Sequence, residues 1–141
     1  MFQHITPEML AELSPQAQKR LRDWWETSEG DKFFDSFERW CLCYDGSRDM
    51  VVSTGLSKHD KQVCLPLLNI GQCIELLLGY DEQRQVDLFS LCTESLYKGI
   101  VWIVDGENRA VRSDELIRAL WDAAKAVLEA GDCPEWKEAR R

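Results

Sequence analysis

The sequence predicts a single α+β domain, in which two main helices and an N-terminal helix pack on a small, mainly antiparallel sheet of four to five strands. Apolar residues repeat at helical spacing in two segments, 70–78 and 114–130. Short runs of β-favouring residues end at the turn signals Asp45-Gly46 and Asp105-Gly106. Short connections of this kind favour antiparallel pairing.

The length and composition of the chain are typical of a single domain. A chain of 141 residues with 45% hydrophobic residues is large enough to bury one core. We predict that residues 1–132 form this domain. Residues 133–141, which follow the last glycine, are predicted to be a polar tail.

The N-terminal half begins with two helix-start signals. Thr6-Pro7 and Ser14-Pro15 each place a capping residue before a proline, and the second starts a predicted helix over residues 15–26. The aromatic-rich segment 33–44 is compatible with helix or strand, and its β-favouring residues tip the prediction to a strand over 39–44. This strand and residues 50–54 are predicted to form a hairpin, and residues 55–62 a polar loop.

The C-terminal half alternates strands and helices. Residues 63–67 are predicted to be a short edge strand, because Pro66 cannot donate a backbone hydrogen bond. Asn69 is the expected N-cap of the next helix, and Gly79 its expected C-cap. Segment 83–97 suits either helix or strand, with a preference for strand. The clearest strand is 99–104, and Ser113 is expected to cap the last helix.

The net charge of −8 disfavours whole classes of partner. A negative surface repels nucleic-acid phosphates and anionic membranes. The first residues lack the pattern of a signal peptide, and no apolar run approaches the ~20 residues that a membrane span needs. We therefore expect a cytoplasmic protein whose six cysteines are reduced thiols.

The sequence does not predict a metal site or a cofactor. Zinc-binding cysteine pairs are separated by about two to four intervening residues, whereas Leu42 alone separates Cys41 from Cys43, and both thiols would share one face of a strand. His4 and His59 have no paired ligand nearby. Catalysis by a cysteine–histidine pair needs a thiol beside an imidazole, but His59 lies in a charged segment that predicts a solvated loop.

No catalytic residue is predicted either. Glu75 interrupts an otherwise apolar helix, and one acidic position per turn is the pattern of a solvent-facing residue. Glycine-rich phosphate-binding loops are missing from the sequence. These observations favour a non-enzymatic protein.

The six tryptophans are the one compositional excess, because tryptophan is enriched both in cores and at interaction hot spots. If Trp24 and Trp25 are both helical, their side chains diverge by about 100°. Core packing is the favoured interpretation for both, and the alternative is that one of them lies at a rim or an interface. With Trp136 in the tail, they are the candidate binding residues.

Two apolar blocks also carry a resemblance. LPLLNIGQCIELL (65–77) and SDELIRALWDAAKAVL (113–128) resemble small uncharacterised proteins of phages and prophages of Gram-positive bacteria, and residues 22–31 are similar to the N-terminal part of those proteins. The resemblance implies a phage or prophage origin. It implies no activity, cofactor or site residue.

The first functional hypothesis is a phage-type accessory protein that binds another protein. A small hydrolase or transferase that uses a cysteine or Glu75 is the alternative, and an acidic mimic of nucleic acid is a further one. The chain is expected to be a monomer or a homodimer.

Overall fold

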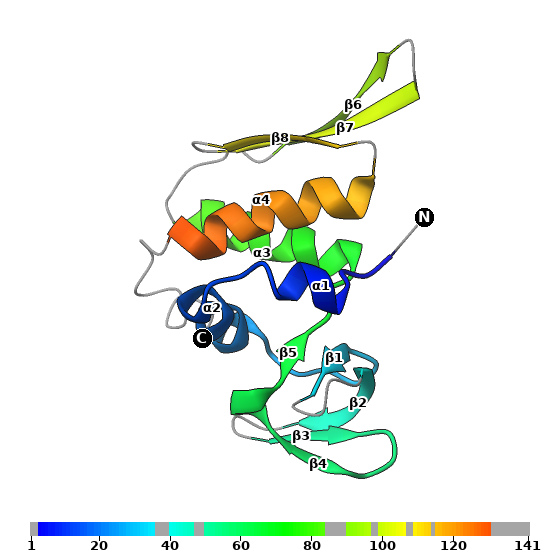
Figure 1. The fold of residues 1–141 in the computed structure, drawn as a ribbon, viewed down its shortest axis with the longest axis vertical. Helices are drawn as coiled ribbons and strands as arrows, with labels where there is room; N and C mark the ends of the chain where they lie inside the picture. The colour runs from blue at the N-terminus through cyan, green and yellow to red at the C-terminus, as the bar shows by residue number, and fades with distance from the viewer. Residues whose placement is uncertain are drawn as a thin grey trace. The chain divides into compact units, whose positions relative to one another are not determined.

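The computed structural model describes residues 3–35, 40–46, 50–83, 90–96, 99–106, 109–113 and 115–130, and it confirms the α+β class (Figure 1). The chain divides into two compact units. One is Thr6–Leu68, and the other combines Met1–Ile5 with Asn69–Arg141. Each unit contains one antiparallel sheet, with five strands in Thr6–Leu68 and three in the other unit. The sequence predicted a single sheet. The predicted tail, residues 133–141, lies outside the described residues.

The unit Thr6–Leu68 opens with the two predicted helix starts. The Thr6 hydroxyl accepts a hydrogen bond from the Met9 backbone N–H (3.2 Å) at the start of α1 (Pro7–Leu10). The Ser14 hydroxyl accepts one from the Ala17 N–H (3.2 Å) at the start of α2 (Pro15–Trp24). Both caps satisfy donors that a helix N-terminus leaves unpaired.

Trp24 and Trp25 are only 4% and 1% exposed, which agrees with core packing and not with the alternative that one of them is a surface binding residue. Trp24 is the last residue of α2, whereas Trp25 has an extended backbone (φ −69°, ψ 118°). The divergence expected of adjacent helical residues therefore does not apply. The Trp25 ring lies 5.9 Å from that of Phe33, and its Nε1 donates to Asp31 Oδ2 at 3.0 Å. Trp136 lies outside the described residues.

The five-stranded sheet has the strand order β4-β3-β2-β1-β5. Its strands are β1 (Lys32–Phe34), β2 (Trp40–Gly46), β3 (Met50–Ser53), β4 (Lys58–Asp60) and β5 (Leu65–Pro66), with a short 3₁₀ helix, η1 (Lys61–Val63), before β5. The predicted hairpin of β2 and β3 is confirmed. The predicted loop 55–62 is corrected, because Met50, Val51 and Val52 pair with residues 58–60 and make them an edge strand.

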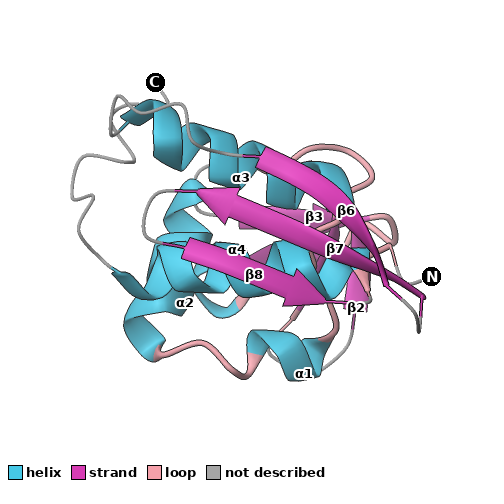
Figure 2. Cartoon of the chain, turned by 90° about the horizontal axis from the view of Figure 1, so that it is seen from above, coloured by secondary structure: helices cyan, strands magenta, loops and turns pink. Residues whose placement is uncertain are grey.

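In the second unit, α3 (Ile70–Gln83), β6 (Ser90–Leu96), β7 (Gly99–Gly106), β8 (Arg109–Ser113) and α4 (Leu116–Ala130) follow one another. The helix α4 contacts α3, β7 and β8, so that it lies under the three-stranded sheet in Figure 2. The buried side chains of α4 are Ile117, Ala119, Leu120, Trp121, Ala123, Ala124, Val127 and Leu128. They confirm the predicted apolar stripe. Strand β6 settles residues 90–96 of the ambiguous segment as a strand.

Asn69 caps α3 as predicted, and Gly79 does not end it. The Asn69 Oδ1 accepts from the Gln72 N–H (2.8 Å), while the Gln72 Oε1 accepts from the Asn69 N–H (3.0 Å). This is the reciprocal arrangement of a capping box. Gly79 has no positive φ, and α3 runs through it to Gln83. The four residues that follow Gly79 include no proline, so the local chemistry permits the helix to continue.

Candidate functional site

One face of the five-stranded sheet collects polar side chains from separate strands. Phe33 pairs with Cys41, so the two side chains are on the same face. Asp35 follows Phe33 by two positions, and the side chains of a strand alternate between faces. The burial of Phe33 and Asp35 on either side of the less buried Phe34 agrees with this alternation. Asp35 and Cys41 therefore both point to the inner face.

His59 reaches the same face from the edge strand β4. It pairs with Val51, which is fully buried, whereas its neighbours Lys58 and Asp60 are exposed. The imidazole meets the ring of Phe33 edge-on, with 5.3 Å between the ring centroids. The sheet thus brings a carboxylate, a thiol and an imidazole together.

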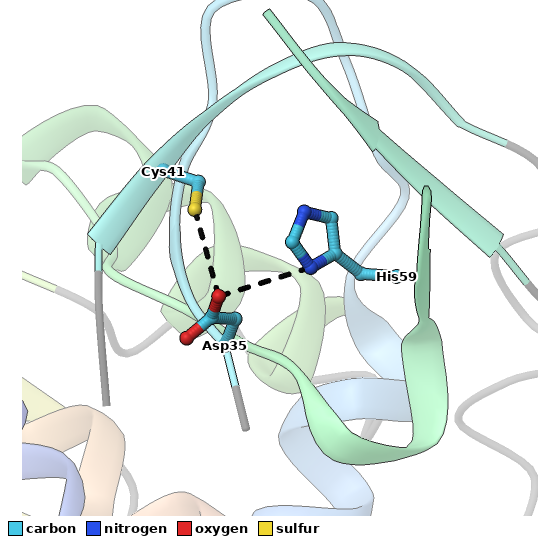
Figure 3. A group of neighbouring side chains, drawn as sticks. All are labelled: Asp35, Cys41 and His59. Carbon is cyan, nitrogen blue, oxygen red and sulfur yellow. Dashed lines mark hydrogen bonds and ion pairs between the residues drawn. The ribbon is translucent and has the colours of Figure 1, made fainter. Parts of the chain in front are cut away.

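We call Asp35, Cys41 and His59 the inner cluster (Figure 3). Asp35 Oδ2 lies 3.8 Å from His59 Nδ1 and 3.9 Å from Cys41 Sγ. One ligand atom of each residue lies within 4.8 Å of the other two. The side chains of His59 and Asp35 are 9% and 0% exposed, so little water reaches the space between them.

The imidazole of His59 is incompletely paired. Its Nδ1 is farther from Asp35 than a hydrogen bond allows. Its Nε2 is buried, and among the described residues it has no hydrogen-bond partner. A buried polar atom without a partner costs on the order of 1–3 kcal/mol. The inner cluster therefore has an unmet requirement for a donor, an acceptor or a cation at this ring.

A second thiol, that of Cys64, comes to the same face just before β5. Phe33 pairs with Pro66 and Phe34 with Leu65, so the continued register places Cys64 opposite Asp35. Alternation from the buried Pro66 turns the Cys64 side chain inward, and Cys64 is 0% exposed. Burial, and next the Asp35 carboxylate, raise the pKa of the Cys64 thiol to about 11.

Hydrogen bonds hold the segment that connects His59 to Cys64. The Asp60 carboxylate accepts from the Gln62 N–H (2.9 Å) and caps η1. Lys61 Nζ donates to the Trp25 carbonyl at 2.6 Å, and Arg22 Nε donates to the Cys64 carbonyl at 3.1 Å. The contacts with Trp25 and Arg22 hold the backbone from which the side chains of His59 and Cys64 project.

The chemistry of the inner cluster suits metal binding better than nucleophilic catalysis. A catalytic cysteine needs a neighbouring base and a nearby positive charge that favours the thiolate. The Cys41 thiol donates to the Asp35 carboxylate, so the charge beside this thiol is negative and not positive. Sulfur, nitrogen and carboxylate oxygen around one point are instead a ligand set that zinc accepts.

Sequence analysis did not identify this cluster, because it placed His59 in a solvated loop. The signal was present in Lys58-His59-Asp60, a strand pattern with the imidazole on one side and two charges on the other. Glu75 is exposed, as predicted for the solvent face of α3. Cys41 and Cys43 share one face of β2 as predicted, with the exposed Leu42 between them.

The opposite face of the same sheet is apolar and exposed. Leu42, Tyr44 and Met50 are 40%, 54% and 36% exposed, and they alternate with buried residues of β2 and β3. The pairing of β2 with β3 is irregular between Cys43 and Asp45, and a bulge of this kind re-aims a side chain, here that of Tyr44. We call Leu42, Tyr44, Met50 and Val52 the outer face.

Within the described part of the chain, no helix combines the length and the apolar character that a membrane span requires. No protein-family model matches the chain, and neither a curated protein nor a solved structure is significantly similar to it.

Proposed function

We propose that the chain is a non-enzymatic accessory protein that acts by binding another protein, and that the outer face is its binding surface. The observation that carries the proposal is the exposure of Leu42, Tyr44 and Met50 on one side of a single sheet. Tyrosine and methionine are enriched at protein interfaces, and a group of exposed apolar side chains is a common mark of such a site.

The surroundings of the outer face support this proposal. Lys32 pairs with Leu42, and Lys58 and Asp60 pair with Val52 and Met50, so these charges lie on the same side of the sheet. An apolar centre with a charged rim is the usual composition of an interface. Lys58 and Asp60 are exposed on the edge strand, where charges also discourage unspecific strand pairing.

Two further observations support a non-enzymatic role of phage type. The imidazole that a cysteine-dependent enzyme would use is only 9% exposed, and the charge beside the Cys41 thiol is the carboxylate of Asp35. The resemblance of residues 65–77 and 113–128 to phage and prophage proteins supports an origin among accessory genes. We therefore propose that the partner is a protein of the Gram-positive host or of the phage itself.

The test compares variants that differ only at the outer face. Leu42→Ser with Tyr44→Ser removes its centre, whereas Leu78→Ser changes a side chain that is 48% exposed in the other unit and serves as the matched control. Tagged proteins are exposed to a lysate of a Gram-positive host, and retained proteins are quantified by mass spectrometry.

We expect a protein that the wild type and Leu78→Ser retain and that the double variant loses. Equal retention by the double variant, or no retention by folded wild type, would contradict the proposal. Light scattering on the same three proteins identifies the homodimer. A wild-type dimer that the double variant alone dissociates would show that the outer face binds a second copy and not a foreign protein.

A further inference from the structure

We propose that Asp35, Cys41, His59 and Cys64 bind one Zn²⁺ ion beneath the five-stranded sheet. This inference is independent of the proposed partner, because it concerns the inner face of the sheet. The four side chains offer two sulfurs, one imidazole nitrogen and one carboxylate oxygen, all of them groups that zinc uses. Four protein ligands leave no open position, so the ion is structural and not catalytic.

The spacing of the inner cluster is close to that of a tetrahedral site. Bonds of roughly 2.0–2.3 Å from zinc to its ligands place neighbouring ligand atoms about 3.3–3.8 Å apart. The Asp35 Oδ2 atom is 3.8 Å from the imidazole and 3.9 Å from the Cys41 sulfur. The remaining separation is within 4.8 Å. Zinc binding therefore requires these side chains to draw closer together than they are in the structure.

The orientation of His59 is a second, independent observation. Figure 3 shows the nitrogen-bearing edge of its ring turned toward Cys41 and Asp35. The side chain is 9% exposed, and its buried Nε2 has no hydrogen-bond partner among the described residues. Coordination to a cation would use a nitrogen of this edge, and Asp35 is then a ligand of the same ion and not a hydrogen-bond partner of the ring.

Cys64 is the fourth ligand that we infer from the register of β1 and β5, and its sulfur must move toward the inner cluster, because it lies outside the group of ligand atoms within 4.8 Å of one another. It lies opposite Asp35 with its side chain inward and fully buried. Two thiolates and a carboxylate carry three negative charges, of which a divalent cation compensates two. Without the ion both thiols keep their protons, and coordination of the cation releases them.

The position of the ion explains how so small a unit is stabilised. The strands of the sheet are short, and three of them have three residues or fewer. Small domains with limited cores commonly rely on metals or disulfides. All five cysteines among the described residues are free thiols. Zinc would join the end of β1, the strands β2 and β4, and the residue before β5 into one closed unit.

The experiment uses the full chain, purified under reducing conditions without added metal, and then reconstituted with Zn²⁺ or Co²⁺. We expect about one zinc per chain by elemental analysis. Cobalt should give the near-ultraviolet thiolate-to-cobalt band and the intense visible bands of a tetrahedral site. Removal of the metal with a chelator should lower the thermal midpoint, and zinc should restore it.

Variants assign the ligands. Cys41→Ser, Cys64→Ser and His59→Ala should lose most of the bound metal. Cys43→Ser is the matched control, because Cys43 is a buried thiol on the same strand and face but outside the inner cluster, and it should keep the metal. Far-UV circular dichroism checks that each variant is folded.

Two results overturn the proposal. One is a folded wild-type chain that holds no zinc after reconstitution and gives no thiolate band with cobalt. The other is a folded Cys41→Ser or His59→Ala variant that binds zinc as tightly as the wild type does. If every ligand variant fails to fold, the wild-type stoichiometry and cobalt spectrum still decide, because an octahedral spectrum without a thiolate band excludes these ligands.

Discussion

Replacement of Trp25 by phenylalanine tests how α2 is attached to the five-stranded sheet. The ring of Trp25 is 1% exposed and lies 5.9 Å from the ring of Phe33. Its Nε1 donates to the Asp31 carboxylate at 3.0 Å, and Lys61 Nζ lies 5.8 Å from the ring centroid. Phenylalanine keeps an aromatic ring in the same place and removes the indole N–H.

The expected loss follows from these contacts. A hydrogen bond to a charged group contributes about 1.5–3 kcal/mol. The smaller ring leaves a void worth about 1 kcal/mol. We therefore expect Trp25→Phe to lower the free energy of unfolding by about 3 kcal/mol. Asp31 keeps its hydrogen bond from the Ser28 N–H (3.0 Å), which prevents a larger loss.

Urea denaturation followed by far-UV circular dichroism measures this change, with the slope of the transition checked for each protein. Tyr44→Phe, which removes a polar group from a side chain that is 54% exposed, is the control and should change stability by less than about 0.5 kcal/mol. A Trp25→Phe variant as stable as this control would refute the reasoning, because it would mean that the indole hydrogen bond contributes nothing.

Three further changes test the other unit. Leu120→Ala, at a fully buried position of α4, should cost about 2–5 kcal/mol in the same urea assay, and a loss under 1 kcal/mol would place Leu120 outside the core. Asn69→Ala should cost about 1 kcal/mol because it breaks the reciprocal cap of α3, whereas Asn69→Ser should recover most of it. Burial raises the pKa of the Cys73 thiol to about 12 from its ordinary value of 9.0. The unfolded chain therefore releases this proton first, and stability should fall as the pH rises above 9, by up to about 1.4 kcal/mol per pH unit from this group. Cys73→Ala should flatten that alkaline loss, and an unchanged slope would show that Cys73 is not the group responsible.

Local signals in the sequence predicted the starts of elements well. The side chains of Thr6, Ser14 and Asn69 each accept a hydrogen bond from the backbone N–H three residues later. A capping pattern in the sequence therefore identifies them without any knowledge of the fold. Gly79 shows the limit of such signals. Glycine is compatible with a C-cap and with a helix interior at a cost of about 1 kcal/mol. Packing of the whole helix decides between the two, and sequence spacing does not show it.

The inner cluster could not be predicted because strand register creates it. Asp35 and Cys41 are brought together by the pairing of β1 with β2, and His59 by the pairing of β4 with Val51 of β3. A shift of one residue in any of these pairings turns a side chain to the opposite face. The sequence contained the ligand types but not the register. How Trp24 and Trp25 are both buried likewise depends on where α2 ends, which residue spacing does not show.

Alternation along β2 links the two faces of the sheet. Cys41 points inward to the inner cluster, and the next residue, Leu42, points outward to the outer face. A rigid backbone at Cys41 therefore also fixes the position of Leu42, and the bulge that follows aims Tyr44 to the same side. Ordered presentation reduces the conformational entropy that a partner must overcome on binding. The proposed metal site beneath the sheet and the proposed contact surface above it thus both depend on β2, since whatever holds its inward side chains in place also orders its outward ones.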